Sequence, residues 1–249
     1  MNHYSDIGFE IFKPQDTLNI FNLIHLNEEI ERTEYNIPNS NGIVYCIYKL
    51  GEIRYSAKLN YNTHQIRAIG LGHNNEKITN AKYIKTIKGN SRALNFDNIM
   101  IEKDEIPFWF CCPNIEIINI EKYQDIKLRI ASFADTIEIK DLPKNNKAFN
   151  NSEELREYIL THDLEMAEES YIANFKGDQS YAFVSGIIKD FKLEKNLFTE
   201  KDYYTIDFDC LGLYFKALVD SKAINKDDLQ VGKVICGNFW NTALLEIEK

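Results

Sequence analysis

From Ile43 onward, an apolar residue at every second position is the pattern that most restricts the fold of this chain. Residues 43–48 and 53–59 follow this pattern, and the Lys-Leu-Gly-Glu between them suits a hairpin turn. Alternation with a period of two is typical of half-buried strands. It predicts an N-terminal half built mostly on one antiparallel sheet, with further strands at residues 65–71, 81–87, 99–102, 106–110, 115–120, 127–133 and 136–139.

The C-terminal half predicts one helix followed by short strands. The helix covers residues 151–170, with Asn151 or Ser152 as its cap and acidic residues in its first turn. Gly186 marks a bend in the first strand, and a polar stretch at residues 222–230 predicts a helical turn. A bent first strand and a short helix before the fourth suit a small OB-like β-barrel or sheet. The predicted strands are residues 182–193, 204–210, 213–219, 231–239 and 242–247.

An N-terminal helix is predicted at residues 15–34, where Asp16 caps a stretch with apolar residues at helical spacing. The predicted fold class is therefore α+β. The polar segment 141–150, with Pro143 followed by Asn145 and Asn146, predicts a linker. It divides the 249 residues into an α+β domain at 1–140 and a helix plus small antiparallel β-barrel at 151–249.

Negative charge gathers in the last hundred residues. Residues 150–249 carry 19 Asp and Glu against 11 Lys and Arg, whereas residues 1–149 carry 19 against 18. Nearly all of the net charge of −9 therefore belongs to the C-terminal part. Such an asymmetry bears on binding partners rather than on fold, and it indicates a basic protein partner and makes nucleic acid an unfavoured one.

Six carboxylates are the candidate partner-binding residues. Four lie on the acidic face of the predicted second helix, and two lie two apart on a predicted strand, where both side chains point the same way. The six are Asp163, Glu165, Glu168, Glu169, Asp207 and Asp209. A solvated, solubilising surface is the alternative reading of the same residues.

No catalytic residue, cofactor or metal is predicted. His162, Glu165 and Glu169 have helical spacings of three and four, but helical acid clusters are commonly solvated faces. The adjacent Cys111 and Cys112 do not match a C-x₂-C zinc pattern. Gly70-Leu71-Gly72 lacks the third glycine of a dinucleotide fingerprint, so residues 70–75 are interpreted as a loop. The sequence therefore predicts a protein that is not an enzyme.

The five cysteines have no regular spacing, and the N-terminus lacks the basic and apolar stretches of a secretory signal. An odd number of cysteines without a disulfide framework suits reduced thiols. No apolar run approaches the roughly 20 residues that a transmembrane helix needs. These features predict a cytoplasmic protein that does not associate with a membrane.

Two short segments carry a resemblance. Residues 131–135, Ala-Ser-Phe-Ala-Asp, and residues 231–240, Val-Gly-Lys-Val-Ile-Cys-Gly-Asn-Phe-Trp, resemble a loosely defined group of uncharacterised bacterial proteins. The resemblance covers the C-terminal half and its motifs are mostly structural. It implies a bacterial origin and adds no activity.

Three classes of function remain open. The first is a non-catalytic acidic binding protein, such as an immunity-type inhibitor that covers a basic bacterial toxin. The alternative is an OB-like nucleic-acid-binding module that uses a modest basic run in the N-terminal half. That run consists of Lys77, Lys82, Lys85, Lys88 and Arg92. The third is an enzyme whose site assembles from dispersed residues, because catalytic groups are set by geometry rather than by sequence position.

Overall fold

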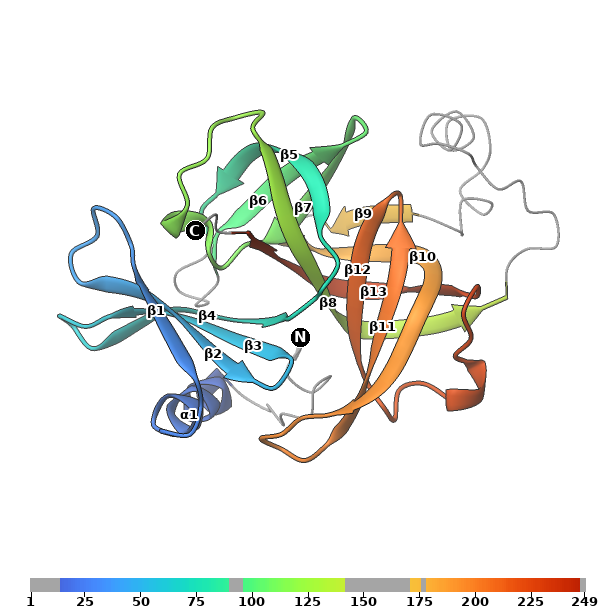
Figure 1. Ribbon diagram of the computed structural model, residues 1–249, viewed down its shortest axis with the longest axis horizontal. Coiled ribbons are helices and arrows are strands. Elements are labelled where there is room, and N and C mark those ends of the chain that lie inside the picture. The colour runs from blue at the N-terminus through green and yellow to red at the C-terminus, as the bar shows by residue number, and fades with distance from the viewer. Residues whose placement is uncertain (1–13, 90–95, 142–170, 176–177, 247–249) are drawn as a thin grey trace.

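The computed structural model describes residues 14–89, 96–141, 171–175 and 178–246. It is mostly β, with 60% strand and one short helix in that part of the chain (Figure 1). The strands form a four-stranded antiparallel sheet and a nine-stranded mixed sheet. The expected α+β class is thus corrected to a mostly β fold, while the antiparallel sheet near the N-terminus is confirmed for its first strands.

The first sheet, sheet A, is a meander in the order β1-β2-β3-β4, and the helix α1 precedes it. Their bounds are α1 Pro14–His25, β1 Arg32–Asn36, β2 Ile43–Leu50, β3 Ile53–Asn60 and β4 Gln65–His73. The predicted hairpin at residues 49–52 is confirmed, since β2 and β3 pair from Ile43–Asn60 to Leu50–Ile53. Gly51 has a φ of 65°, which the turn requires and which glycine adopts without strain.

The predicted helix at residues 15–34 is wrong in its second half, because α1 ends at His25. Beyond it the backbone turns, and the side chain of Asn27 accepts a hydrogen bond from the Glu29 amide at 3.0 Å. Residues 32–36 then pair with β2 along their full length. In this segment pairing with β2 takes the place of helical hydrogen bonding, so tertiary structure overrides the local pattern. Among the described residues, no helix has the length and apolar character needed to cross a bilayer.

One face of sheet A carries the buried contacts with α1 and with part of the second sheet. Phe21 and Ile24 of α1 belong to the same apolar cluster as Tyr48 and Tyr55 of the sheet. Phe133 from the second sheet joins this cluster as well. The helix and part of the second sheet therefore pack on this face of sheet A, while Tyr45 and Ala68 on the other face form a cluster with Phe96 and Cys111.

The second sheet, sheet B, contains the other nine strands. Two 3₁₀ helices, η3 and η5, interrupt their succession. The bounds in the first part are β5 Thr79–Ile87, β6 Asn98–Lys103, β7 Ile106–Cys111, η3 Ile115–Ile117 and β8 Asp125–Lys140. Those in the second part are β9 Tyr171–Phe175, β10 Asp178–Lys195, β11 Asp202–Cys210, β12 Leu213–Asp220, η5 Lys226–Asp228 and β13 Val234–Leu245.

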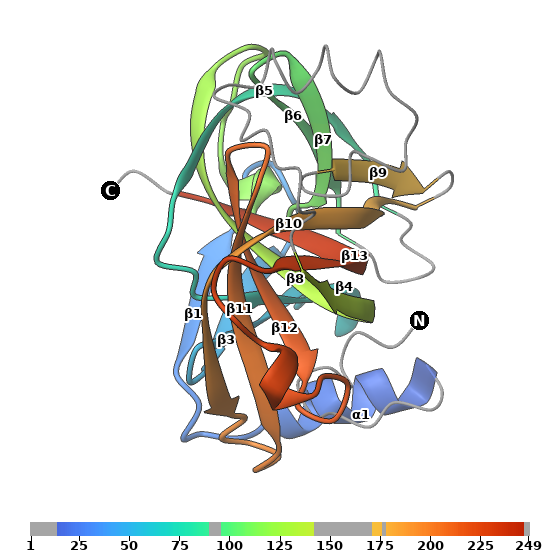
Figure 2. The same ribbon diagram turned by 90° about the vertical axis from the view of Figure 1, so that its right-hand side faces the viewer.

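The pairings of sheet B form two closed circuits that share β8 and β13. The first runs β5-β6-β7-β13-β8 and the second β10-β11-β12-β8-β13. Each circuit has four antiparallel pairings and one parallel pairing, namely β7 with β13 and β12 with β8. Figure 2 shows β8 and β13 crossing the middle of the molecule, with β5–β7 above them and β11–β12 below.

Apart from β9, the two parts of sheet B repeat the same succession of elements, three strands, a 3₁₀ helix and a long strand. The two hairpins also match, because the two-residue turns Asp104–Glu105 and Leu211–Gly212 all have positive φ, from 50° to 73°. Such turns follow the right-handed twist of the strands. The long strand β8 pairs antiparallel with β5 and parallel with β12, and the long strand β13 pairs antiparallel with β10 and parallel with β7.

Several strand predictions need correction. The strands predicted at residues 231–239 and 242–247 share one strand, β13, which covers residues 234–245, and those predicted at residues 127–133 and 136–139 lie in one strand, β8. The fifth place in the C-terminal circuit is therefore taken by β8, which comes from the N-terminal half. Residues 115–120 contain η3 instead of a strand. Strands β5, β6 and β7 belong to sheet B rather than to the sheet of β2 and β3, because their edges pair with β8 and β13.

The long first strand of the C-terminal circuit and the helical turn before β13 are confirmed as β10 and η5. Gly186 lies where β10 passes from β13 to β11, and an added Cβ would lie 2.4 Å from the carbonyl oxygen of Asp209. A glycine is needed for this close approach. The bulge itself lies just beyond, between Ile188 and Asp190.

The predicted second helix and nearly all of the predicted linker, residues 142–170, lie outside the described residues. Strand β8, which precedes these residues, pairs with β12 and β13, which follow them. Residues 131–135 and 231–240, the two segments on which the expected resemblance rests, are neighbours in this ladder, where Phe133 pairs with Trp240 and Ala134 with Phe239. The strands on both sides of the predicted linker therefore share one sheet.

Candidate functional site

A pocket of about 250 Å³ lies where one end of sheet A meets β10, β11 and β12. Five carboxylates line it, and only two ammonium groups, those of Lys192 and Lys216, do so. The carboxylates are those of Glu52, Glu76, Asp190, Glu194 and Asp207. The pocket is therefore acidic, and it draws its charge from segments far apart in the sequence.

The pairing of β10, β11 and β12 gathers one group of these side chains. Asp190 of β10 lies opposite Asp207 of β11, which in turn lies opposite Lys216 of β12. Lys192 lies opposite Thr205. Alternate residues of a strand share one face, so the positions 190, 192 and 194 all point to the pocket side.

Sheet A supplies the opposite wall. Glu52 follows the β2–β3 turn, and His73 ends β4, where it pairs with Ile53. The segment after β4 is anchored because the amide of Asn74 donates to the Glu52 carbonyl at 2.8 Å. The buried side chain of Asn75 donates to the Ile130 carbonyl at 3.0 Å. Residues 70–73 thus belong to a strand, not to the predicted loop.

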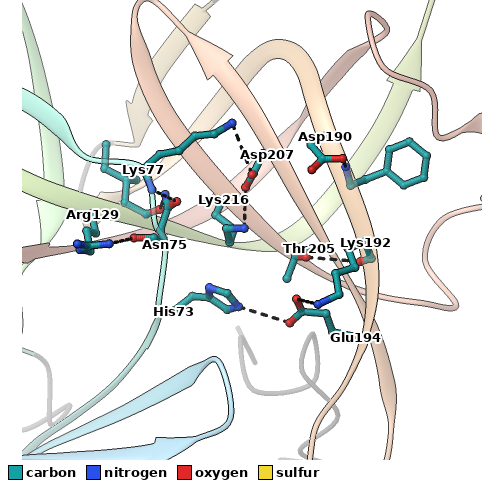
Figure 3. A network of polar contacts seen from close by, with 12 residues as sticks. His73, Asn75, Lys77, Arg129, Asp190, Lys192, Glu194, Thr205, Asp207 and Lys216 are labelled. Atoms are coloured by element: carbon teal, nitrogen blue, oxygen red, sulfur yellow. Dashed lines mark hydrogen bonds and ion pairs between the residues drawn. The ribbon is translucent and has the colours of Figure 1, made fainter.

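His73 is the most unusual group in the pocket. It is 3% exposed, and neither of its ring nitrogens makes a hydrogen bond with a described residue. Its Nε2 lies 3.7 Å from Oε2 of Glu194, toward which the ring points in Figure 3. Burial lowers the pKa of His73, although Glu194 opposes this effect. The imidazole is therefore neutral at neutral pH and offers an acceptor nitrogen.

Glu194 is held as a carboxylate. Its Oε2 accepts a hydrogen bond from the Tyr203 hydroxyl at 2.9 Å, and its Oε1 lies 3.3 Å from Nζ of Lys192. His73, Tyr203 and Lys192 together lower the pKa of Glu194 to about 2, against the opposing effect of burial. The Lys192 side chain is 72% exposed, so this ammonium is the mobile partner of a largely buried carboxylate.

Only two of the six predicted binding residues lie in the described part of the chain, Asp207 and Asp209. Asp207 lines the pocket and forms ion pairs with Lys216 at 2.9 Å and with Lys77 at 3.6 Å. Asp209 lies at the hairpin, where its Oδ1 accepts a hydrogen bond from the Gly212 amide at 3.3 Å. The structure does not bring these two aspartates into one site. Asp163, Glu165, Glu168 and Glu169 lie outside the described residues.

Cysteine-based catalysis and metal binding receive little support from the described residues. Cys111 and Cys112 are buried, and burial raises the pKa of Cys112 to about 12, so its thiol stays protonated. In the described ranges, no three His, Cys, Asp or Glu side chains are grouped so that they could hold a metal ion. A larger hollow of about 650 Å³ is lined mainly by isoleucines and polar side chains near the start of β8 and carries no comparable cluster of charge.

Sequence reasoning missed His73, Glu52, Glu76, Asp190 and Glu194. The only local signals are a histidine at the end of an apolar strand and the alternating charges of residues 189–195. No family model, curated protein or solved structure matches the chain. Its function is therefore argued from the geometry of the acidic pocket.

Proposed function

We propose that this chain is a non-catalytic acidic binding protein that docks onto a basic protein partner. The form that we favour is an immunity-type inhibitor that covers a basic bacterial toxin. The observation that carries the proposal is the gathering of five carboxylates and a buried, neutral histidine in one pocket. The excess of acidic residues in the C-terminal hundred residues supports it.

Opposite charge on two proteins steers their encounter and raises the association rate. A concave acidic site with low-dielectric walls strengthens this effect locally, because it focuses the field. The groups in the pocket are also held in place, since Glu194 accepts from Tyr203 and Asp207 pairs with Lys216. A preorganised site reduces the entropy lost on binding.

The proposal includes the cytoplasm of a bacterium as the location. In support, the five cysteines, all of which lie in the described part of the chain, form no disulfide, as suits a reducing compartment. The binding role does not require a reaction. Burial raises the pKa of Cys112 to about 12, so this thiol is protonated at neutral pH.

The test is affinity capture from a lysate of the source organism, with the purified protein as bait. We expect a basic protein to be retained at low salt, released as the salt concentration rises, and inhibited in its own activity by the bait. A bait that carries Glu52→Gln and Glu76→Gln should retain less of it. Recovery of no basic protein, or of one whose binding does not depend on salt, contradicts the proposal.

An OB-like nucleic-acid-binding module is the second candidate. The observation that favours it is the closed five-strand circuit, which we relate to the five-stranded, partly open Greek-key arrangement of OB-folds. Lysines also lie over aromatic rings of β7 and β12, Lys85 over Trp109 at 5.3 Å and Lys77 over Tyr214 at 5.8 Å. Stacking on such rings requires a basic groove, which the charge of the pocket opposes.

Single-stranded DNA and RNA columns separate the two candidates. The nucleic-acid function requires retention at low ionic strength that falls steeply with added salt, and that is reduced by Lys85→Ala. The binding-protein function requires passage through the column without retention.

A further inference from the structure

The acidic pocket also indicates which group of a partner it would take. Its carboxylates repel anions, and its described residues lack the arrangement that a metal ion needs. An apolar group that took the place of Lys192 would leave Oε1 of the largely buried Glu194 carboxylate without its charged partner, which is costly. The remaining class is an organic cation with several N–H donors.

The protein already places a cation of its own at this position. The Lys192 ammonium lies 3.3 Å from Oε1 of Glu194, yet the lysine side chain is 72% exposed. An ion pair made by such an exposed lysine contributes little stability. Glu194 and His73, by contrast, are largely buried and fixed by their strands. The fixed half of this ion pair is thus the acceptor, and the replaceable half is the lysine.

A guanidinium matches these acceptors better than an ammonium does. It is planar, is always charged, and presents five N–H donors in a rigid fork. The two oxygens of the Glu194 carboxylate face separate partners, Oε1 the Lys192 ammonium and Oε2 the Tyr203 hydroxyl, and the Asp190 carboxylate lines the same pocket, so one guanidinium edge has acceptors for more than one donor. Charge-assisted hydrogen bonds of this kind are the strong ones.

We infer that the pocket receives an arginine side chain of the basic partner, which displaces Lys192 from Glu194 and donates to the Glu194 carboxylate beside His73. The source of the arginine rests on the proposed function, whereas the chemistry of the pocket does not. Lys192 then acts as an internal competitor, which pairs with Glu194 in the absence of the partner.

The test uses the full-length protein and two matched probes, N-acetyl-arginine amide and the neutral N-acetyl-citrulline amide. Binding is followed through the imidazole NMR signals of His73. We expect the arginine probe to shift these signals with a dissociation constant on the order of 1 mM, as suits one side chain in a small pocket, and the citrulline probe to leave them in place.

Two variants move the affinity in opposite directions. Glu194→Gln removes the charge of the acceptor and should weaken binding about tenfold. Lys192→Met removes the competitor but keeps an apolar stem, and should tighten binding about threefold. Lys189→Met, on the same strand and also exposed, is the matched control and should leave the affinity unchanged.

Equal shifts from the two probes, or a Lys192→Met variant that binds no more tightly than Lys189→Met, overturn the inference. The Lys192→Met comparison holds even where Glu194→Gln destabilises the fold, because Lys192 is mostly exposed. Failure of the proposed function is a separate result: the arginine probe binds as expected, but no basic protein is captured. Capture of a basic protein whose retention is unaffected by Glu194→Gln and Lys192→Met leaves the function standing and removes the inference.

Discussion

The side chain of Asn114 pairs with the backbone of Leu245 as a strand would. Its Nδ2 donates to the Leu245 carbonyl at 2.8 Å, and its Oδ1 accepts from the Leu245 amide at 3.1 Å. Asn114 is 3% exposed and lies just before η3, so it ties the end of β13 to the connection between β7 and β8. One amide thus closes the first circuit where the β7–β13 pairing is short.

Replacement of Asn114 by alanine should therefore lower the free energy of unfolding by about 2 kcal/mol, since it leaves two buried backbone groups of Leu245 unsatisfied. Urea denaturation of the variant and of the parent measures this loss. Asn119→Ala is the control, because Asn119 is exposed, and it should change the stability by less than about 0.5 kcal/mol. Equal stabilities for the two variants would contradict the role of Asn114.

Acid should destabilise the protein through Glu194. The pKa of Glu194 falls from an ordinary 4.5 to about 2 on folding, so its contribution is present above pH 4.5 and is lost between 4.5 and 2. After allowance for solvent screening, the loss is on the order of 2 kcal/mol. Urea denaturation at several pH values measures it, and Glu194→Gln should flatten the curve in this range. A variant with the same acid dependence as the parent would refute the assignment.

His73 should add a second step at higher pH. Burial lowers its pKa below the ordinary 6.5, so the native state binds fewer protons than the unfolded state. The stabilising contribution is present above pH 6.5 and is lost as the pH falls through the native pKa. The imidazole NMR titration locates that pKa directly, and a midpoint at or above 6.5 would contradict the prediction.

Gly237 lies in the pairing of β8 with β13, at a position that has no room for a side chain. An ideal Cβ there would lie 2.0 Å from the carbonyl oxygen of Thr136 on the neighbouring strand. Gly237→Ala should cost about 3 kcal/mol, because the backbone of β8 must shift. At Gly72 a Cβ would meet only Leu244 and Arg54 at 3.6 Å or more, so Gly72→Ala should cost less than about 1 kcal/mol. Thermal or urea denaturation of the pair gives the comparison.

The five thiols should be slow to react in the native protein. All five are buried, and burial raises the pKa of Cys46 to about 11 and that of Cys112 to about 12. A disulfide reagent at pH 8 should label them only after unfolding, when all five react. Rapid labelling of any one of them in the folded state would show an exposed thiolate.

Local patterns predict much of this fold. The apolar run at residues 43–48 and the alternation in residues 53–59 predict the β2–β3 hairpin, and the alternation in residues 204–210 predicts β11, because a half-buried strand imposes a period of two on its own residues. Local patterns do not predict that residues 127–139 form one strand, since its partners in β12 and β13 lie more than 80 residues away. The repeated succession of elements is also invisible in the sequence, because the two parts share turn geometry and pairing rather than residue types.

The candidate site was less predictable than the fold. Asp207 was identified from its strand, but its ion pairs with Lys216 and Lys77 come from two other segments. His73 and Glu194 meet only because sheet A packs against the outer side of β10 and β11. A buried histidine becomes notable when its surroundings are known, and no spacing in the chain encodes them.

The interlocking of β8 and β13 also restricts when this protein can fold during synthesis. Ile130 pairs with Ala243, so β8 waits during synthesis for residues that lie more than 100 positions further along the chain. Until they leave the ribosome, both circuits are open and β8 exposes an unpaired edge, which favours aggregation and engagement by chaperones. Loss of the final strand would open both circuits at once, and the many contacts between distant residues favour slow folding.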